Sequence, residues 1–254
     1  MQVTFEMSLS IDLNGRIALV TGGGTGLGRA GTDALVAAGA TVIIAGRRRD
    51  VVEKAAAEAG ARAMTCDVSD PEAAKELVDR IVAEHGKLDI LVNAAGLNIR
   101  GDSFEYGPED WDKVHAINTR GLFFMSQAAG RVMRANGYGK IVNIASMASE
   151  IGMPFIVAYG SSKGGVKQIT QGLAVEWAKA GIRVNAIEPG WFRTELTEPL
   201  FHNKEWVAKV ENRVPMGRAG EPEEVGGAIA FLSSPLSDYI TGAVIKVDGG
   251  ALAA

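Results

Sequence analysis

Short apolar runs alternate with amphipathic runs along all 254 residues of the chain. The apolar runs are continuous rather than interrupted by polar residues, which is typical of strands that are buried on both faces of a parallel sheet. The strands that this pattern predicts span residues 16–20, 41–45, 61–66, 88–93, 140–145, 183–187 and 243–247. The pattern therefore favours an α/β fold, a doubly wound parallel sheet of about seven strands with helices on both faces.

The runs between these strands have the spacing of amphipathic helices. Helices are expected at residues 27–38, 71–85 and 222–232. Asp70 is the expected N-cap of the second helix, and Pro71 stands at the first helical position, where proline is favoured. Because strands and helices alternate from end to end without a linker or a repeat, we expect residues 1–254 to form a single domain.

Residues 191–214 depart from this regular alternation. They form a longer mixed stretch after Pro189-Gly190, and aromatic side chains recur in it at Trp191, Phe192, Phe201 and Trp206. Long insertions in compact domains are usually functional. The stretch is therefore interpreted as a lid over a substrate, and a pair of packing helices is the alternative.

A glycine-rich loop, Thr-Gly-Gly-Gly-Thr-Gly-Leu-Gly, occupies residues 21–28 directly after the first expected strand. Gly22, Gly26 and Gly28 lack Cβ atoms, so backbone N–H groups can approach a pyrophosphate at the start of the following helix. A strand before the loop and a helix after it are the context that this motif requires. The loop predicts a dinucleotide site, although a glycine turn can also be only a turn.

Tyr159 and Lys163 stand four residues apart, a spacing that places both side chains on one face of a helix. A phenol has a pKa of about 10, so it is a poor acid-base catalyst near neutrality unless a cation favours its anionic form. Lys163 is the candidate cation. Ser146 ends the apolar run 140–145 and could hydrogen-bond the oxygen whose proton Tyr159 moves. The alternative for such a pair alone is ordinary surface chemistry.

With these residues, the chain resembles the short-chain dehydrogenase/reductase family from residue 12 to residue 250. The segments that match in family order are the glycine loop, Asn93-Ala-Ala-Gly96, Asn118, Ser146, Tyr159, Lys163 and Pro189-Gly190. The resemblance implies a Rossmann-type enzyme that moves a hydride between a nicotinamide cofactor and a secondary alcohol. One departure is Ala94, where the family commonly has asparagine, and it leaves the catalytic assignment unchanged.

The resemblance assigns catalytic roles to Asn118, Ser146, Tyr159 and Lys163. Tyr159 is the acid-base, Ser146 fixes the reacting oxygen, and Lys163 lowers the pKa of Tyr159 and grips the nicotinamide ribose. Asn118 would hold a water that links Lys163 to solvent, with a purely structural role as the alternative. The cofactor residues implied besides Tyr159 and Lys163 are Gly22, Thr25, Gly26, Leu27, Gly28, Arg47, Arg48, Asp67, Val68, Asn93, Gly96, Pro189, Gly190 and Thr194. An N-cap role is the alternative for Asp67.

The end of the second expected strand bears on the choice of cofactor. Relatives that prefer NAD commonly carry an acidic residue where Gly46 stands, and it accepts hydrogen bonds from the adenosine ribose. Arg47 and Arg48 follow instead, and a guanidinium can bind the 2′-phosphate of NADP in bidentate fashion. Thr25 stands where many NADP-preferring relatives have a second basic residue, and its presence there is an argument against NADP. We expect NADP, with NAD as the alternative.

The substrate side is less specific. Residues 143–150, 188–197 and 214–218 look most like the sugar-acid dehydrogenases of the family, of the gluconate 5-dehydrogenase type. Arg100 is the candidate for a substrate carboxylate, with a plain surface arginine as the alternative, and Ser146 and Trp191 are assigned to the substrate as well. A 3-oxoacyl-thioester reductase is the enzymatic alternative. A cofactor-sensing regulator on the same fold is the non-enzymatic one.

The composition limits the classes of partner that the protein is expected to bind. A net charge of −4 argues against nucleic acid or an anionic membrane surface as a main partner. No run of about 18 apolar residues occurs, and residues 1–12 lack the pattern of a secretory leader. Cys66 is the single cysteine and is expected to be a buried thiol, and no cluster has the spacing of metal ligands. We expect a cytoplasmic protein with a small-molecule substrate, and the resemblance implies a homotetramer.

Overall fold

A computed structural model describes residues 10–195 and 197–254 of the chain. Within these residues the strands form one seven-stranded parallel sheet in the order β3-β2-β1-β4-β5-β6-β7. The strands are β1 Ile17–Thr21, β2 Thr41–Gly46, β3 Arg62–Thr65, β4 Ile90–Asn93, β5 Gly139–Ile144, β6 Ile182–Pro189 and β7 Val244–Val247. The doubly wound, Rossmann-type sheet expected from the sequence is confirmed, and every expected strand is present.

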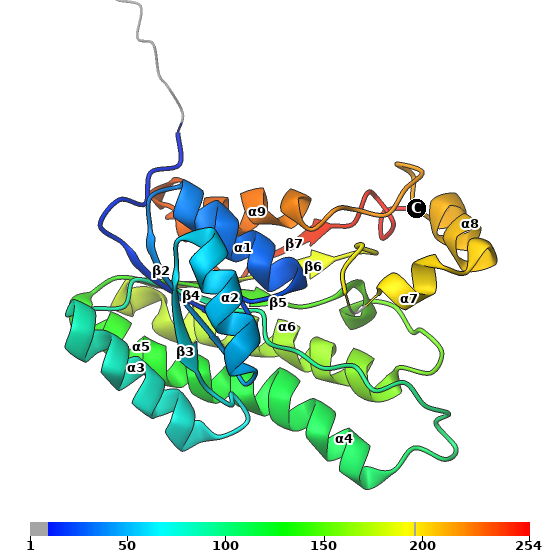
Figure 1. Ribbon diagram of the computed structural model, residues 1–254, viewed down its shortest axis with the longest axis horizontal. Coiled ribbons are helices and arrows are strands. Elements are labelled where there is room, and N and C mark those ends of the chain that lie inside the picture. The colour runs from blue at the N-terminus through cyan, green and yellow to red at the C-terminus, as the bar shows by residue number, and fades with distance from the viewer. Residues whose placement is uncertain (1–9, 196) are drawn as a thin grey trace, which may run out of the picture.

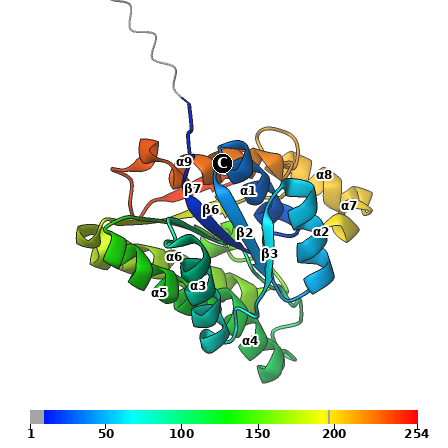
Figure 2. The ribbon, with the colours of Figure 1, turned by 60° about the vertical axis from the view of Figure 1, so that its left-hand side comes forward.

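Helices cover both faces of this sheet, as Figures 1 and 2 show. They are α1 Gly26–Ala37, α2 Arg49–Ala59, α3 Pro71–His85, α4 Pro108–His115, α5 Leu122–Asn136, α6 Val157–Trp177, α7 Glu198–Phe201, α8 Lys204–Arg213 and α9 Glu223–Ser233. α1, α2 and α9 bury their apolar faces on one side, in a core with Val20 of β1. α3, α5 and α6 pack on the other side, in a core with Leu19. Neighbouring residues of one strand thus enter opposite cores, which explains the continuous apolar runs.

Helix α3 shows how local sequence sets an element's limits. Its observed span, Pro71–His85, is the span that the sequence predicts. Asp70 caps it by accepting a hydrogen bond from the backbone N–H of Glu72 at 2.9 Å, and Pro71 supplies no N–H that would need a partner. Gly86 ends the helix in the left-handed region, at a φ of 77° that favours glycine.

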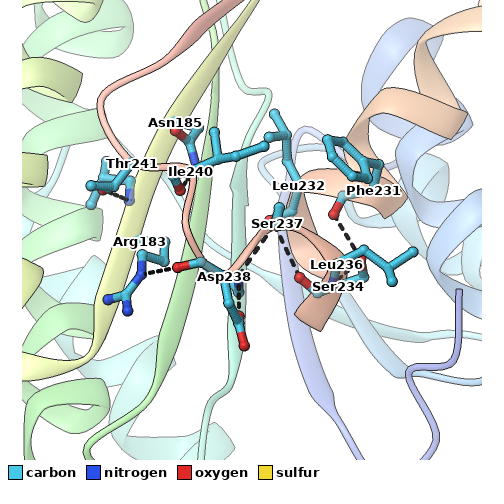
Figure 3. Close-up of polar contacts among 12 residues, drawn as sticks. Arg183, Asn185, Phe231, Leu232, Ser234, Leu236, Ser237, Asp238, Ile240 and Thr241 are labelled. Carbon is cyan, nitrogen blue, oxygen red and sulfur yellow. Dashed lines mark hydrogen bonds and ion pairs between the residues drawn. The ribbon is translucent and has the colours of Figure 1, made fainter.

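The connection between α9 and β7 is held to the sheet by side chains (Figure 3). Arg183 of β6 donates from Nε to the carbonyl oxygen of Asp238 at 2.6 Å, and Asn185 donates from Nδ2 to that of Ile240 at 2.9 Å. Lys140 of β5 is buried beneath them and pairs with the Asp238 carboxylate at 2.7 Å. These contacts fix the course of the chain into the edge strand β7.

The segment expected to be a lid folds as α7 and α8, which lie together at one end of the molecule in Figure 1. Two tryptophans of this region, Trp191 and Trp206, pack on a small apolar cluster with Met147, Val210 and Val214. Met147 follows Ser146, so the cluster joins the segment to the loop after β5. Leu196, which the expected lid includes, lies outside the described residues, as do residues 1–9 of the expected domain.

Candidate active site

A cavity of about 760 Å³ opens at the carboxyl ends of the strands. Segments far apart in the sequence converge on it because parallel strands point their carboxyl ends to the same edge of the sheet. The expected site residues that line it are Gly22, Thr25, Gly26, Leu27, Gly28, Arg47, Arg48, Val68, Gly96, Ser146, Tyr159, Lys163, Pro189, Gly190 and Thr194. The residues assigned to cofactor and to catalysis therefore share one cavity.

The uncapped start of α1 fits the pyrophosphate of a nicotinamide dinucleotide, and the glycine loop before it packs too closely against its neighbours to carry side chains at Gly22 and Gly28. A Cβ on Gly22 would lie 2.8 Å from Cα of Ala95, and one on Gly28 would lie 2.2 Å from the carbonyl oxygen of Gly22. Thr25 begins α1 without capping it by its side chain, so the first N–H groups of α1 have no side-chain cap. Backbone N–H groups at a helix N-terminus are suited to bind a pyrophosphate.

At the end of β2 the cavity is lined by Gly46, Arg47 and Arg48. A Cβ at residue 46 would lie 2.9 Å from Cγ1 of Val52, so glycine is the residue that fits there. The nearest guanidinium nitrogen of Arg47 lies 3.9 Å from the Asp67 carboxylate, a loose and exposed pair. Such a pair contributes little to stability, so the guanidinium is free to bind a phosphate.

Asp67 does not line the cavity. Its Oδ1 accepts hydrogen bonds from the backbone N–H and the hydroxyl of Ser69, at 3.0 and 2.7 Å. Burial alone would raise the pKa of Asp67, but the bonds from Ser69 and the charge of Arg47 together lower it. The observed role is a local turn rather than an N-cap, since Asp70 caps α3. The expected contact to adenine stays a prediction.

The catalytic candidates come from the end of β5 and the first turns of α6. Ser146 caps a 3₁₀ turn, Met147–Ser149, by accepting a hydrogen bond from the N–H of Ala148 at 3.1 Å. Tyr159 and Lys163 lie on one side of α6, with Nζ of Lys163 5.7 Å from the centre of the phenol ring. Nζ also donates to the carbonyl oxygen of Ile144 at 2.6 Å. The end of β5 therefore positions two of the catalytic candidates: Ser146 follows it closely, and Lys163 is hydrogen-bonded to Ile144, its last residue.

Burial dominates the ionisation of this pair. It raises the pKa of Tyr159, and the hydrogen bond with Ser146 works in the opposite direction. It lowers the pKa of Lys163 from 10.5 to about 8. Burial disfavours the charged form of each group, the phenolate of Tyr159 and the ammonium of Lys163. The expectation that Lys163 depresses the pKa of Tyr159 stays a prediction.

Asn118 lies in a π-helical turn, Ala116–Gly121, between α4 and α5. Its amide exchanges two hydrogen bonds of 2.8 Å with the backbone of Leu97 and donates a third to Oγ of Ser162 at 2.9 Å. Ser162 in turn donates to the carbonyl oxygen of Tyr159 at 2.7 Å. The side chain therefore ties the loop after β4 to the catalytic helix. It does not line the cavity, and the expected water link stays a prediction.

Asn93, expected at the cofactor, is instead buried behind the cavity. Its Nδ2 donates to Oγ of Ser126 and to Oδ1 of Asn143, both at 2.9 Å. Since Ser126 lies on α5 and Asn143 on β5, Asn93 braces the middle of the sheet. Asn93 does not line the cavity, and the expected contact with the cofactor stays a prediction.

The two substrate candidates other than Ser146 are not brought into the cavity. Arg100 is exposed, and Trp191 packs in the apolar cluster below α8. Arg100 is nevertheless tied to the catalytic helix through its neighbour, because the N–H of Gly101 donates to the carbonyl oxygen of Phe155 at 3.0 Å. Phe155 stands four residues before Tyr159, and its φ of 66° is unusual for a residue with a side chain.

Sequence reasoning missed Thr197, which lines the cavity beside Thr194. The Thr197 hydroxyl donates to the carbonyl oxygen of Phe192 at 2.6 Å and accepts from the N–H of Thr194 at 3.0 Å. The two threonine hydroxyls lie 3.1 Å apart. The Thr-x-x-Thr spacing was the available signal. Cys66 also lines the cavity, and it is the buried thiol that the sequence predicts, with a pKa raised by burial to about 11.

Within the described ranges, no three or more of His, Cys, Asp and Glu gather in a way that could hold a metal ion. Over the same ranges, no helix has the length and apolarity needed to cross a membrane.

Comparison with known proteins decides the family. A family model described as enoyl-(acyl carrier protein) reductase matches residues 22–251. Gluconate 5-dehydrogenase of Gluconobacter oxydans (strain 621H) is 40% identical over 94% of this chain and 95% of that protein. 2-Dehydro-3-deoxy-D-gluconate 5-dehydrogenase of Escherichia coli (strain K12) is 42% identical over 96% of this chain and 98% of that protein. The chain belongs to the short-chain dehydrogenase/reductase family.

Solved structures of the family agree in fold. A gluconate 5-dehydrogenase from Burkholderia cenocepacia J2315, in complex with NADP and tartrate, superposes with a TM-score of 0.91 at 36% identity. The match covers 96% of this chain and 98% of that one. As a short-chain dehydrogenase/reductase, the protein is an NAD(P)-dependent oxidoreductase that acts on a hydroxyl group. The resemblance expected from the sequence is thereby confirmed.

Proposed function

We propose that the protein transfers a hydride between NADP(H) and the secondary alcohol or ketone of a sugar acid or polyol. The observation that carries this proposal is that Ser146, Tyr159 and Lys163 line the same cavity as the glycine loop. A dinucleotide in that loop and an alcohol beside Tyr159 would then lie within reach of each other.

The residues of the chain supply binding and proton transfer. A bound nicotinamide dinucleotide supplies the acceptor or donor of the hydride. Tyr159 removes the hydroxyl proton during oxidation and returns it during reduction, and Ser146 holds the reacting oxygen. Since burial raises the pKa of Tyr159, the phenol form prevails near neutrality, which suits the donation of a proton to a ketone. Removal of a proton from an alcohol would be favoured at alkaline pH.

The proposed preference for NADP rests on the end of β2. Arg47 and Arg48 line the cavity there, and Gly46 provides no carboxylate that would repel a 2′-phosphate. The solved relative from Burkholderia cenocepacia holds NADP, which supports the same choice. NAD is the alternative.

The proposed substrate class rests on the relatives and on Arg100. Both curated relatives named above act on sugar acids. Arg100 is held at the loop that meets Phe155, close in the chain to Tyr159, and its exposed guanidinium is free to meet a carboxylate. The description of the matching family model keeps a thioester reductase as the second candidate. The lid at residues 191–214 would exclude water from either substrate.

We also propose that the protein is a homotetramer, because relatives of this family commonly pair the long helices that correspond to α5 and α6. The proposed compartment is the cytoplasm. Val175 on α6 is 84% exposed, which is consistent with a covering partner. Sedimentation of the full chain at micromolar concentration would decide the oligomeric state.

A substrate screen tests the activity. The reduction of NADP+ and of NAD+ would be followed at alkaline pH with gluconate, other aldonates, neutral hexitols and 3-hydroxyacyl thioesters. The proposal expects turnover with aldonates or hexitols and a higher kcat/KM with NADP+. Turnover confined to the thioesters would establish the second candidate instead.

A further inference from the structure

Glu188 is a fully buried acidic residue that the reaction described above does not use. Its exposed fraction is 0%, and neither carboxylate oxygen has a hydrogen-bond partner among the described residues. The hydroxyl of Ser149 is likewise buried and unpaired among those residues. Buried polar groups without a partner are rare and costly, so such a cluster calls for a physical explanation.

The position of Glu188 links it to the catalytic serine. The N–H of Ala145 donates to the carbonyl oxygen of Ile187 at 2.8 Å, so Glu188 lies across from the point where β5 ends and Ser146 begins. Ser149 is the last residue of the 3₁₀ turn that Ser146 caps. It is also close enough to Glu188 to affect the pKa of that carboxyl as a hydrogen-bond donor.

Three charged groups face Glu188. Glu150 and Lys167 form an ion pair with each other. Lys246 on β7 is the Cα partner of Glu188 in the sheet, and it is exposed. Burial raises the pKa of Glu188, and the negative charge of Glu150 raises it further. Lys167, Lys246 and Ser149 act in the opposite direction without outweighing these causes.

We propose that Glu188 is a positioning residue, a neutral carboxylic acid that shares a hydrogen bond with Ser149 and so fixes the turn that begins at Ser146. A protonated carboxyl both donates and accepts, as a hydroxyl does, so one such bond relieves both unpaired groups. An ionised carboxylate would be a charge in a dry interior, which is costly unless it is paired. Loss of the proton would therefore loosen the turn and misplace Ser146.

The first test needs no substrate. Glu188→Gln keeps a donor and an acceptor but cannot ionise, and Glu176→Gln, at an exposed position on α6, is the control. A group with a raised folded-state pKa binds more protons in the folded state, so wild-type stability should fall as pH rises above 4.5, the ordinary glutamate pKa. In urea unfolding between pH 4.5 and 9, Glu188→Gln should gain stability over wild type as pH rises. Glu176→Gln should not, because its side chain is exposed to water.

If Glu188 were instead ionised and paired with Lys246, the outcome would be the reverse. Glu188→Gln would then lose stability relative to wild type at neutral pH, and Lys246→Met would lose as much. That pair of results would overturn the proposal.

The second test concerns Ser146 and rests on its proposed role, with whichever alcohol the screen identifies. Ser149→Ala and Glu188→Leu should each lower kcat about 10- to 100-fold, the effect of a misplaced catalytic group, and leave the Kd of the dinucleotide unchanged. The double variant should be no worse than either single one, since both remove the same bond. The ratio of kcat for Glu188→Gln to that of wild type should rise with pH. A kcat ratio that does not change with pH, or kcat losses that add up in the double variant, would refute the positioning role. The stability test needs no substrate, so its result does not depend on whether the proposed function is correct.

Discussion

Nζ of Lys163 donates a hydrogen bond to the carbonyl oxygen of Ile144 at 2.6 Å, at the end of the strand that leads to Ser146. The bond satisfies one donor of the ammonium group of a residue that is only 5% exposed, and burial still lowers its pKa to about 8. Keeping this cation in the cavity therefore lowers the free energy of unfolding.

That cost predicts how stability depends on pH. The unfolded chain holds the Lys163 proton up to pH 10.5, while the folded protein releases it at about 8, so stability should rise with pH across this window. Lys163→Met should be more stable than wild type below pH 8, apart from a constant offset for the lost hydrogen bond. Urea unfolding of both proteins at pH 7, 9 and 10.5 would show the difference shrinking. A difference independent of pH would mean that Lys163 has an ordinary pKa.

Tyr159→Phe should remove turnover while leaving dinucleotide affinity nearly unchanged, because it deletes the atom that carries the proton and little else. General acid-base groups supply about 10²- to 10⁴-fold in rate, and kcat should fall by that factor. Steady-state kinetics and a fluorescence titration with NADPH measure the two quantities. Tyr239→Phe is the control, since Tyr239 is fully exposed. Retention of more than about a tenth of wild-type kcat would remove Tyr159 from its role.

Arg47→Ala should weaken NADP far more than NAD, because only NADP carries the 2′-phosphate. A lost charge-assisted hydrogen bond is worth about 1.5–3 kcal/mol, so KM for NADP should rise roughly 10- to 100-fold. Arg49→Ala is a matched control, since Arg49 pairs with Glu53 at 2.7 Å and does not line the cavity. Equal changes for both cofactors would contradict the phosphate assignment.

Arg100→Ala should raise KM for aldonates and leave neutral hexitols almost untouched. The guanidinium is remote from the reacting carbon, so its loss removes binding that ground and transition states share. Kinetics with gluconate and a hexitol would measure both effects, with Arg134→Ala at the far end of α5 as the control. An equal change for the two substrates would show that Arg100 shapes the loop rather than binding a carboxylate.

The sheet, the limits of α3 and the cavity-lining glycines follow from local sequence, since apolar runs, caps and missing Cβ atoms act within a few residues. Ser146, Tyr159 and Lys163 could be placed together because parallel strands end at one edge. The sequence could not show the direction of the Tyr159 pKa, which depends on burial by segments far apart in the chain. It also could not show that Asn93 is hydrogen-bonded to Ser126 and Asn143, which come from α5 and β5.

Loop residues were the least predictable. Trp191 was assigned to substrate from its position after Pro189-Gly190, but packing with Trp206 and Met147 turns it into the apolar cluster. Arg100 sits on a loop whose course is set by the hydrogen bond from Gly101 to Phe155. No periodicity marks such a contact, because it joins two irregular segments.

The contact of Gly190 with the end of β7 has a consequence for the order in which the protein is built. Gly190, part of the cavity wall, donates its N–H to the carbonyl oxygen of Val247 at 2.9 Å, and a Cβ there would meet Cα of Asp248 at 2.8 Å. On a ribosome these partners emerge after Gly190, and the glycine loop emerges before it. A growing chain can therefore assemble the first five strands of the sheet well before the wall at Gly190 gains its support. Tight dinucleotide capture should accordingly wait until Val247 and Asp248 have emerged.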